Sequence, residues 1–247
     1  MRIAVAGGTG TLGSYVVEVL RTGGHDPVVL SRGRGVDLVT GAGLDQALDG
    51  AQAVIDVSNR ITTSRSKAVG FFEAATTNLL AAGHRTGIRH HVAVSIVGID
   101  RVGLGYYAGK LRQEELVLAS SRPVSVLRAT QFHEFAGQVL QQVPGPVAIV
   151  PRARVQPIAA REVAAALAEL AIGTPVGMAP ELAGPREESL ADMGRRLLRA
   201  RGSRRPVLQA RLPVAGASAM ASGGLLPTGP GPRGVQTYED WLAERAR

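Results

Sequence analysis

The chain contains no cysteine. Disulfide bonds, thiolate catalysis, and zinc or iron–sulfur sites built on cysteine are therefore excluded. No uninterrupted run of about 18 apolar residues is present, so we expect no membrane span. The apolar stretch at the start ends at Gly7 and is too short for the core of a secretory signal. A cytoplasmic protein without a membrane partner is the resulting expectation.

Aromatic residues are also scarce, at 4% of the sequence, and the 28 basic residues include only two lysines, Lys67 and Lys110. The formal net charge is +8, but the arginines are scattered and few rings are available for stacking on bases. This pattern does not favour a nucleic-acid partner. Part of the positive charge is suited to attracting an anionic cofactor. The 247 residues, 45% of them hydrophobic, suffice for one large domain with an ample core.

Strand-like and helix-like segments alternate along the first two-thirds of the chain. This alternation predicts an α/β fold of the Rossmann type, a doubly wound parallel sheet with helices on both faces. We treat residues 1–247 as a single domain in which roughly residues 144–247 form a small substrate-covering lobe. The predicted strands are 2–6, 27–31, 35–37, 53–57, 91–97 and 124–128, with a further extended segment at 206–212. The predicted helices are 11–20, 44–48, 66–82, 106–119, 131–143, 161–171, 188–200 and 238–246.

The most informative motif follows the first predicted strand. Residues 7–13 read Gly-Gly-Thr-Gly-Thr-Leu-Gly and open the first predicted helix. Glycines permit positive φ and a close approach of the backbone, and a helix N-terminus offers unpaired N–H groups to an anion. The strand-turn-helix context therefore predicts a dinucleotide pyrophosphate site that includes Gly7, Thr9, Gly10, Thr11, Leu12 and Gly13.

The second predicted strand ends in Ser31-Arg32-Gly33-Arg34. A site for NAD usually has an acidic residue here, which binds the ribose 2′-hydroxyl, and none is present. Arg32, with Arg34 in reserve, is suited to a 2′-phosphate instead. We therefore expect NADP(H) as the preferred cofactor, with NAD(H) possible as well. The alternative is that both arginines are simply solvated.

A second constellation follows the predicted strand 91–97. Tyr106 and Lys110 are four residues apart, so one face of a helix presents both. A nearby ammonium group lowers the pKa of a tyrosine, and the phenol then exchanges a proton with a substrate oxygen while hydride moves. Ser95 is placed to hydrogen-bond the reacting oxygen. The alternative is an ordinary helix-start tyrosine with a solvated lysine.

Several other polar residues follow or lie in predicted strands. Val57 and Ser58, with Asn59 and Arg60, form a candidate wall of the cofactor site, or else a plain polar loop. Asp56 is either functional or the cap of that loop. His90 and His91 open a strand, and we expect them to be structural.

These motifs together resemble the short-chain dehydrogenase/reductase superfamily, and most closely its atypical, NmrA-like branch. The residues that carry the resemblance lie in Gly7–Gly13, Leu30–Arg32, Val54–Val57, Thr77–Gly83, Val94–Gly98, Tyr106–Lys110 and Leu127–Phe132. The resemblance implies a Rossmann fold with a small C-terminal substrate lobe and spans roughly residues 1–165.

Carried over by motif, the resemblance assigns Ser95, Tyr106 and Lys110 as the catalytic set, with Lys110 also on the cofactor ribose. Residues 129–132 then border the nicotinamide and the substrate. Thr130 is assigned to the cofactor, and Gln131 and Phe132 to the substrate. His133 follows this segment and either enters the substrate pocket or has a structural role as a packed or solvated side chain. The short spacing between Ser95 and Tyr106, and the second phenol at Tyr107, depart from most catalytic members.

The sequence thus predicts an NADP(H)-dependent oxidoreductase that acts on a small carbonyl, enone, quinone or alcohol. The alternative is a non-catalytic NmrA-like regulator that senses the dinucleotide and acts by binding another protein. We expect no metal cofactor and a monomer or homodimer.

Overall fold

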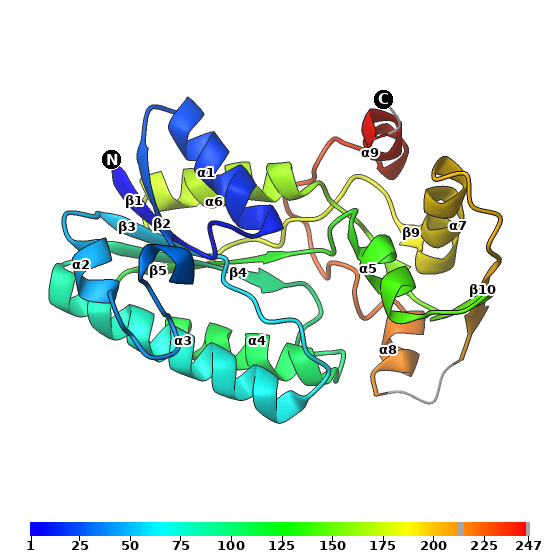
Figure 1. Cartoon of the computed structure of the whole chain (residues 1–247), viewed down its shortest axis with the longest axis horizontal. Coiled ribbons are helices and arrows are strands. Elements are labelled where there is room, and N and C mark those ends of the chain that lie inside the picture. The colour runs from blue at the N-terminus through cyan, green and yellow to red at the C-terminus, as the bar shows by residue number, and fades with distance from the viewer. Residues whose placement is uncertain (212–214, 246–247) are drawn as a thin grey trace. The chain divides into compact units, whose positions relative to one another are not determined.

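The computed structural model describes residues 1–211 and 215–245 (Figure 1). The chain divides into two compact units. The first contains residues 1–95, 104–128 and 160–180, and the described part of the second lies within 96–103, 129–159 and 181–245. Both units are therefore assembled from segments that are separated along the chain. Residues 212–214 and 246–247 lie outside the described part, and so do the ends of the predicted elements 206–212 and 238–246.

A six-stranded sheet in the order β2-β1-β3-β4-β5-β8 forms the centre of the first unit. Its strands are β1 (Arg2–Ala6), β2 (Asp26–Leu30), β3 (Ala53–Asp56), β4 (His90–Ile96), β5 (Val124–Ala129) and β8 (Gly177–Met178). The first strand pairs in parallel with both β2 and β3. From β1 the chain continues to β2 on one side and then crosses to β3 on the other side, so the strand order reverses at β1. Parallel α/β sheets bind ligands at such a point, beyond the carboxyl ends of the strands.

Helices cover both faces of this sheet (Figure 1). One face carries α1 (Thr11–Thr22) packed beside α6 (Ala160–Ile172), and the other carries α3 (Arg65–Thr86) beside α4 (Gly105–Leu118). The short helix α2 (Leu44–Leu48) packs on α3. A buried apolar cluster joins the sheet to α2 and α3 and includes Ala4, Leu30, Leu44, Val54 and Leu79. The predicted Rossmann-type fold is confirmed. No helix within residues 1–211 and 215–245 is long and apolar enough to cross a membrane.

Two features of this sheet differ from the prediction. Residues 35–37 were expected to form the third strand, which is wrong: the chain there leaves a 3-10 turn, η1 (Arg32–Arg34), and enters a loop. Positive φ at Gly35, Gly41 and Gly43 bends this segment away from extended geometry. The sixth strand is instead β8, which pairs with β5. Residues 160–180, expected in the substrate lobe, form α6 and β8 of the first unit.

The second unit has two small sheets. Its strands β6 (Ala148–Pro151) and β10 (Val207–Ala210) pair in parallel, and β7 (Arg154–Val155) pairs antiparallel with β9 (Glu188–Ser189). Its helices are α5 (Phe135–Gln142), α7 (Leu190–Ala200), α8 (Ala217–Ala221) and α9 (Tyr238–Arg245). The predicted helix 131–143 begins only at Phe135, because residues 132 and 133 pair with Ile158 in extended geometry. The predicted helix 188–200 loses its first two residues to β9.

Candidate active site

The glycine motif forms a tight turn between β1 and α1. Gly7 has φ of +81°, and its carbonyl oxygen accepts a hydrogen bond from the Gly10 amide at 2.9 Å. A Cβ atom on Gly13 would lie 2.1 Å from the Gly7 oxygen and 2.6 Å from Gly8 Cα. The turn and the first helical turn are therefore packed backbone to backbone, and this packing requires glycine at position 13.

The N-terminus of α1 has no side chain that neutralises it. Its N-cap is Gly10, no side chain caps it, and its first turn contains no acidic residue. The first N–H groups of a helix have no partner within the helix and, together with the helix dipole, favour an anion. The predicted pyrophosphate-binding residues thus surround a helix end that is suited to phosphate.

The end of β3 meets this turn. A Cβ on Gly7 would lie 2.7 Å from the Val57 carbonyl oxygen and 2.8 Å from Ser58 Cα, so Gly7 packs directly on the backbone of both residues. The Ser58 hydroxyl is buried, and no partner for it occurs among the described residues. A buried hydroxyl without a partner beside a bare helix N-terminus fits a polar ligand such as a dinucleotide.

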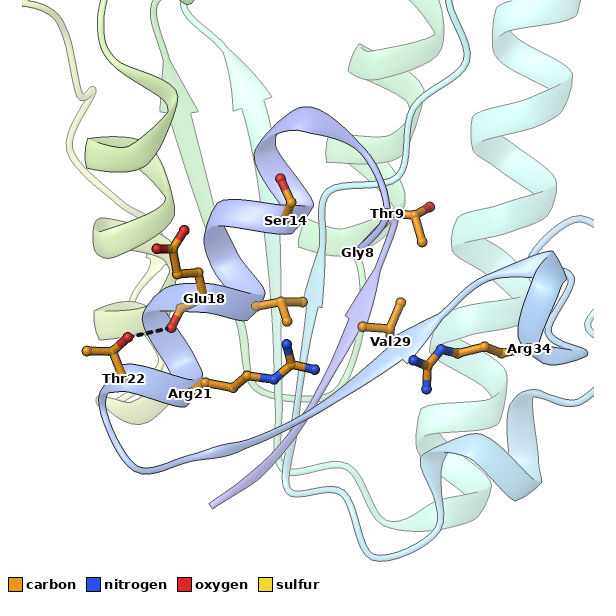
Figure 2. Close-up of a pocket in the computed structure, with 9 residues that line it drawn as sticks. Gly8, Thr9, Ser14, Glu18, Arg21, Thr22, Val29 and Arg34 are labelled. Carbon is orange, nitrogen blue, oxygen red and sulfur yellow. Dashed lines mark hydrogen bonds between the residues drawn. The ribbon is translucent and has the colours of Figure 1, made fainter. Parts of the chain in front are cut away.

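A pocket of about 410 Å³ lies on the other side of the turn (Figure 2). Gly8 and Thr9 line it from the turn, and Arg21 of α1 and Arg34 of η1 point toward one another across it. Arg32, the arginine that the sequence favours for the 2′-phosphate, is exposed and does not line this pocket. Arg34, the reserve residue of the prediction, lines the pocket, and the role of Arg32 stays a prediction. Ser31, the N-cap residue of η1, accepts the amides of residues 34 and 36 through its carbonyl oxygen.

Tyr106 lies in the first turn of α4 and is half-buried. Its hydroxyl donates a hydrogen bond of 2.8 Å to Asn59 Oδ1, which brings together two residues from the predicted list. Burial and the neighbouring Tyr107 raise the pKa of Tyr106 above its usual value. The expectation that the lysine lowers this pKa is therefore wrong. The reason is that Lys110 makes its hydrogen bonds elsewhere.

The Lys110 ammonium group is buried, with 3% of the residue exposed. It donates to the Val94 carbonyl oxygen at 2.7 Å and to Gln113 Oε1, and it lies 5.1 Å from the centre of the Phe72 ring. The Phe72 ring also contacts Tyr106, with 5.9 Å between the two ring centres. Burial lowers the pKa of Lys110 to about 8, against the opposing charges of nearby carboxylates. Lys110 is therefore not the solvated lysine of the alternative interpretation.

Ser95 is also buried, but its hydroxyl donates to Glu114 Oε2 at 2.5 Å. Glu114 in turn forms an ion pair with Arg128, with 2.6 Å between Arg128 Nη2 and Glu114 Oε1. The Ser95 hydroxyl thus donates its hydrogen bond to a carboxylate on α4. The sequence did not predict a role for Gln113 or Glu114, because polar residues within the length of a helix are normally exposed. Their spacing of three and four residues after Lys110, which puts them on the same face of α4, was the available signal.

We expect Arg128→Met to destabilise the protein by about 2 kcal/mol, because Glu114 then loses its buried counter-ion. The loss is smaller than the ~3–5 kcal/mol typical of a fully buried pair, because Ser95 still donates to Glu114. Chemical denaturation measures this difference. The matched control is Arg112→Met, because the exposed ion pair between Arg112 and Glu73 is worth at most about 1 kcal/mol. Equal losses in the two variants would contradict the prediction.

The remaining predicted site residues lie in the second unit. The Thr130 hydroxyl donates to the Gln156 carbonyl oxygen at 2.6 Å and accepts the Gly184 amide at 3.3 Å, so it fastens two loops. The amide of Gln131 is buried, and neither of its polar atoms has a partner among the described residues. Its predicted contact with substrate, like that of the half-buried Phe132, stays a prediction.

His133 is completely buried. Its Nε2 atom lies 3.2 Å from the Gln236 carbonyl oxygen, and its ring packs 5.7 Å from those of both Tyr238 and Trp241. This packing favours the structural alternative for His133. His90 likewise pairs with the Ser125 hydroxyl at 2.9 Å, as expected of a structural histidine.

The comparisons with known proteins agree with this geometry. Residues 3–99 match the model of the NAD dependent epimerase/dehydratase family. A short-chain dehydrogenase/reductase superfamily protein from Agrobacterium tumefaciens with bound NAD is 18% identical, with a TM-score of 0.71 over 100% of this chain and 96% of that one. The NADPH-dependent quinone oxidoreductase QOR2 from Escherichia coli is 18% identical, with a TM-score of 0.68 over 99% and 100%. UDP-glucose 4-epimerase from Thermus thermophilus, in complex with NAD, is 18% identical, with a TM-score of 0.69 over 100% and 94%. No curated protein matches the sequence significantly.

The parallel sheet and the glycine turn between β1 and α1 are those of a Rossmann-type fold. The family match covers the segment that carries this turn, and the fold is that of the solved structures named above. The predicted resemblance to the short-chain dehydrogenase/reductase superfamily is thus supported by the family match over residues 3–99 and by the shared fold.

Proposed function

We propose that the chain is an NADP(H)-dependent oxidoreductase of the atypical, NmrA-like short-chain dehydrogenase/reductase type, acting on a small carbonyl, enone, quinone or alcohol. The observation that carries the proposal is the bare N-terminus of α1, behind a glycine turn and next to a pocket with two facing arginines. The family match supports a nicotinamide cofactor, and so do the structural neighbours, of which one is described as NADPH-dependent and another is in complex with NAD. A cytoplasmic location and a monomeric or homodimeric state remain predictions.

The residues present fit this cofactor. The turn from Gly7 to Gly13 would hold the pyrophosphate, Ser58 would meet the adenosine or ribose side, and Arg34 with Arg21 would hold a 2′-phosphate. Lys110 would hold the nicotinamide ribose. Nicotinamide supplies hydride transfer when it is bound.

The side chains of the protein then have to donate one proton to the substrate oxygen and to orient that oxygen. Because the pKa of Tyr106 is raised, its phenol remains protonated at neutral pH and is ready to donate a proton to the substrate oxygen. This state suits carbonyl reduction, whereas alcohol oxidation needs the phenolate. Ser95 orients the substrate oxygen only after its hydroxyl turns away from Glu114.

The first experiment measures the affinities for NADPH and NADH in the wild type and in Arg34→Ala. We expect Arg34→Ala to weaken NADPH about tenfold, equivalent to one charge-assisted hydrogen bond, and to leave NADH unchanged. The matched control is Arg89→Ala, because exposed Arg89 directly precedes β4 and thus lies at the amino ends of the parallel strands, whereas the glycine turn follows the carboxyl end of β1. Equal loss for both cofactors would contradict a 2′-phosphate role, and loss at Arg32→Ala instead would return the role to Arg32.

Net NADPH consumption with a panel of carbonyls, enones and quinones tests the reaction class. An epimerase regenerates its cofactor and would show no net consumption. Tight NADPH binding without turnover of any of these substrates, together with capture of a protein partner, would support the dinucleotide-sensing regulator instead.

A further inference from the structure

Gln113 connects a buried carboxylate to the buried lysine of the candidate active site. The side chain is 1% exposed, and it lies one helical turn after Lys110 on α4. Its Nε2 atom donates to Asp56 Oδ2 at 2.8 Å, and its Oε1 atom accepts from Lys110 Nζ. Three side chains from β3 and α4 thus form a hydrogen-bonded chain inside the first unit.

Asp56 sets the donor-to-acceptor direction of these hydrogen bonds. Asp56 is completely buried at the end of β3, and its Oδ1 atom accepts the Ser58 amide at 2.9 Å. Its second oxygen is an acceptor only, so the amide of Gln113 must turn its NH₂ group toward it. The amide oxygen of Gln113 then faces Lys110. Asp56 therefore caps the loop through one oxygen, as one of the two alternatives from the sequence predicts, and contacts Gln113 through the other.

We propose that Asp56 and Gln113 are positioning residues, which together hold the Lys110 ammonium group in place and keep it protonated. This inference rests on the proposed function, in which Lys110 binds the cofactor ribose. The hydrogen bonds to Gln113 and to the Val94 carbonyl oxygen occupy two of the three N–H donors of the ammonium group. One donor remains for a ligand.

The charged groups around Lys110 explain why it needs such support. Burial lowers its pKa to about 8, and the charges of Asp56 on β3 and Glu114 on α4 oppose this effect. On β4, burial lowers the pKa of His91, which also interacts with Asp56, and on β5 Arg128 pairs with Glu114.

Asp56 and Glu114 are the acids whose charges act on Lys110. The ring of Phe72 on α3 lies next to Lys110, and Tyr106 is a phenol on α4, the helix that carries Lys110. Since the burial of Lys110 disfavours its charge, loss of an acceptor or of the Asp56 charge must lower its proton affinity further.

The chain offers a direct probe of this effect, because Lys67 and Lys110 are its only lysines. In full-length protein labelled with ¹³C and ¹⁵N lysine, the side-chain signals of two residues titrate, and exposed Lys67 is an internal reference. The pH dependence of kcat/KM with NADPH is recorded on the same samples. Lys110 loses its proton above about pH 8, so activity should fall as the pH rises through this value.

Gln113→Leu removes both hydrogen bonds of the amide at similar volume. We expect the proton affinity of Lys110 to fall about tenfold, the alkaline limb of kcat/KM to move by the same factor, and Lys67 to be unchanged. The control is Gln46→Leu, which replaces an exposed glutamine of α2. Circular dichroism and thermal melting verify the fold of each variant.

Asp56→Asn is the second variant and keeps the test open if Gln113→Leu fails to fold. An asparagine that still accepts the Ser58 amide presents its NH₂ group to Gln113, whose amide must then flip and turn its own NH₂ group toward the ammonium. The proton affinity of Lys110 is again expected to fall at least tenfold.

An unchanged Lys110 titration in a folded variant overturns the positioning role, even if the wild type is active. A lowered Lys110 titration in protein that reduces no substrate supports the positioning role and rejects the proposed oxidoreductase function. The two ideas are thereby tested separately.

Discussion

Replacing Tyr106 with phenylalanine is expected to lower kcat by about 10²–10⁴-fold while leaving the dissociation constant of NADPH unchanged. In the proposed reaction, the phenol gives its proton to the substrate oxygen, and phenylalanine keeps the ring against Phe72 but has no proton to give. Pre-steady-state kinetics with NADPH and a turned-over substrate measure the loss at the chemical step.

The neighbouring phenol supplies the comparison. Tyr107 is buried, with 6% of the residue exposed, whereas Tyr106 is half-buried and its hydroxyl bonds to Asn59. We therefore expect Tyr107→Phe to retain most of the turnover. If Tyr107→Phe loses kcat and Tyr106→Phe does not, Tyr107 is the acid; if both retain kcat, the proposed proton donor is wrong.

Gly13→Ala is expected to destabilise the protein by about 3 kcal/mol and to weaken NADPH binding at least ~100-fold. The added Cβ would lie 2.1 Å from the Gly7 carbonyl oxygen, so either the turn or the start of α1 must move. Movement of either one misaligns the amide groups that are proposed to hold the pyrophosphate. Isothermal calorimetry and chemical denaturation measure the two effects.

Gly70→Ala is the matched control for this substitution. Gly70 lies within α3, is exposed, and has open space where a Cβ would be placed. Alanine is the better helix former, so this variant should gain about 0.5–1 kcal/mol and bind NADPH normally. A Gly13→Ala protein with wild-type stability and affinity would show that the tight packing of the turn is not required.

The elements that depend on local chain chemistry could be predicted from the sequence. Glycines 7, 10 and 13 mark a turn because few other residues fit there, and alternating apolar strands and amphipathic helices indicate a parallel sheet. The strand at 35–37 was mispredicted because one valine between polar residues is a weak signal, and the glycines around it favour a loop. The short edge strand β8 was missed because its two residues have no pattern of their own.

The chemistry around Lys110 was only partly predictable. Its position four residues after Tyr106 drew attention to both residues, but the spacing implied that they act on one another directly. In the structure, Lys110 instead bonds to the Val94 carbonyl oxygen and to Gln113, and Ser95 bonds to Glu114. Hydrogen-bond partners that come from different strands and helices depend on packing distances, which spacing along one helix does not contain.

The sequence by itself determined the Rossmann-type fold class of this protein, because a glycine turn between a buried strand and a helix allows few other geometries. Only the tertiary structure decided which side chains meet. It placed Arg34 rather than Arg32 in the pocket beside the turn, and it joined Asp56 to Lys110 through Gln113. The physical reason is that the turn is governed by local steric limits, whereas burial and hydrogen-bond partners arise only when distant segments pack together.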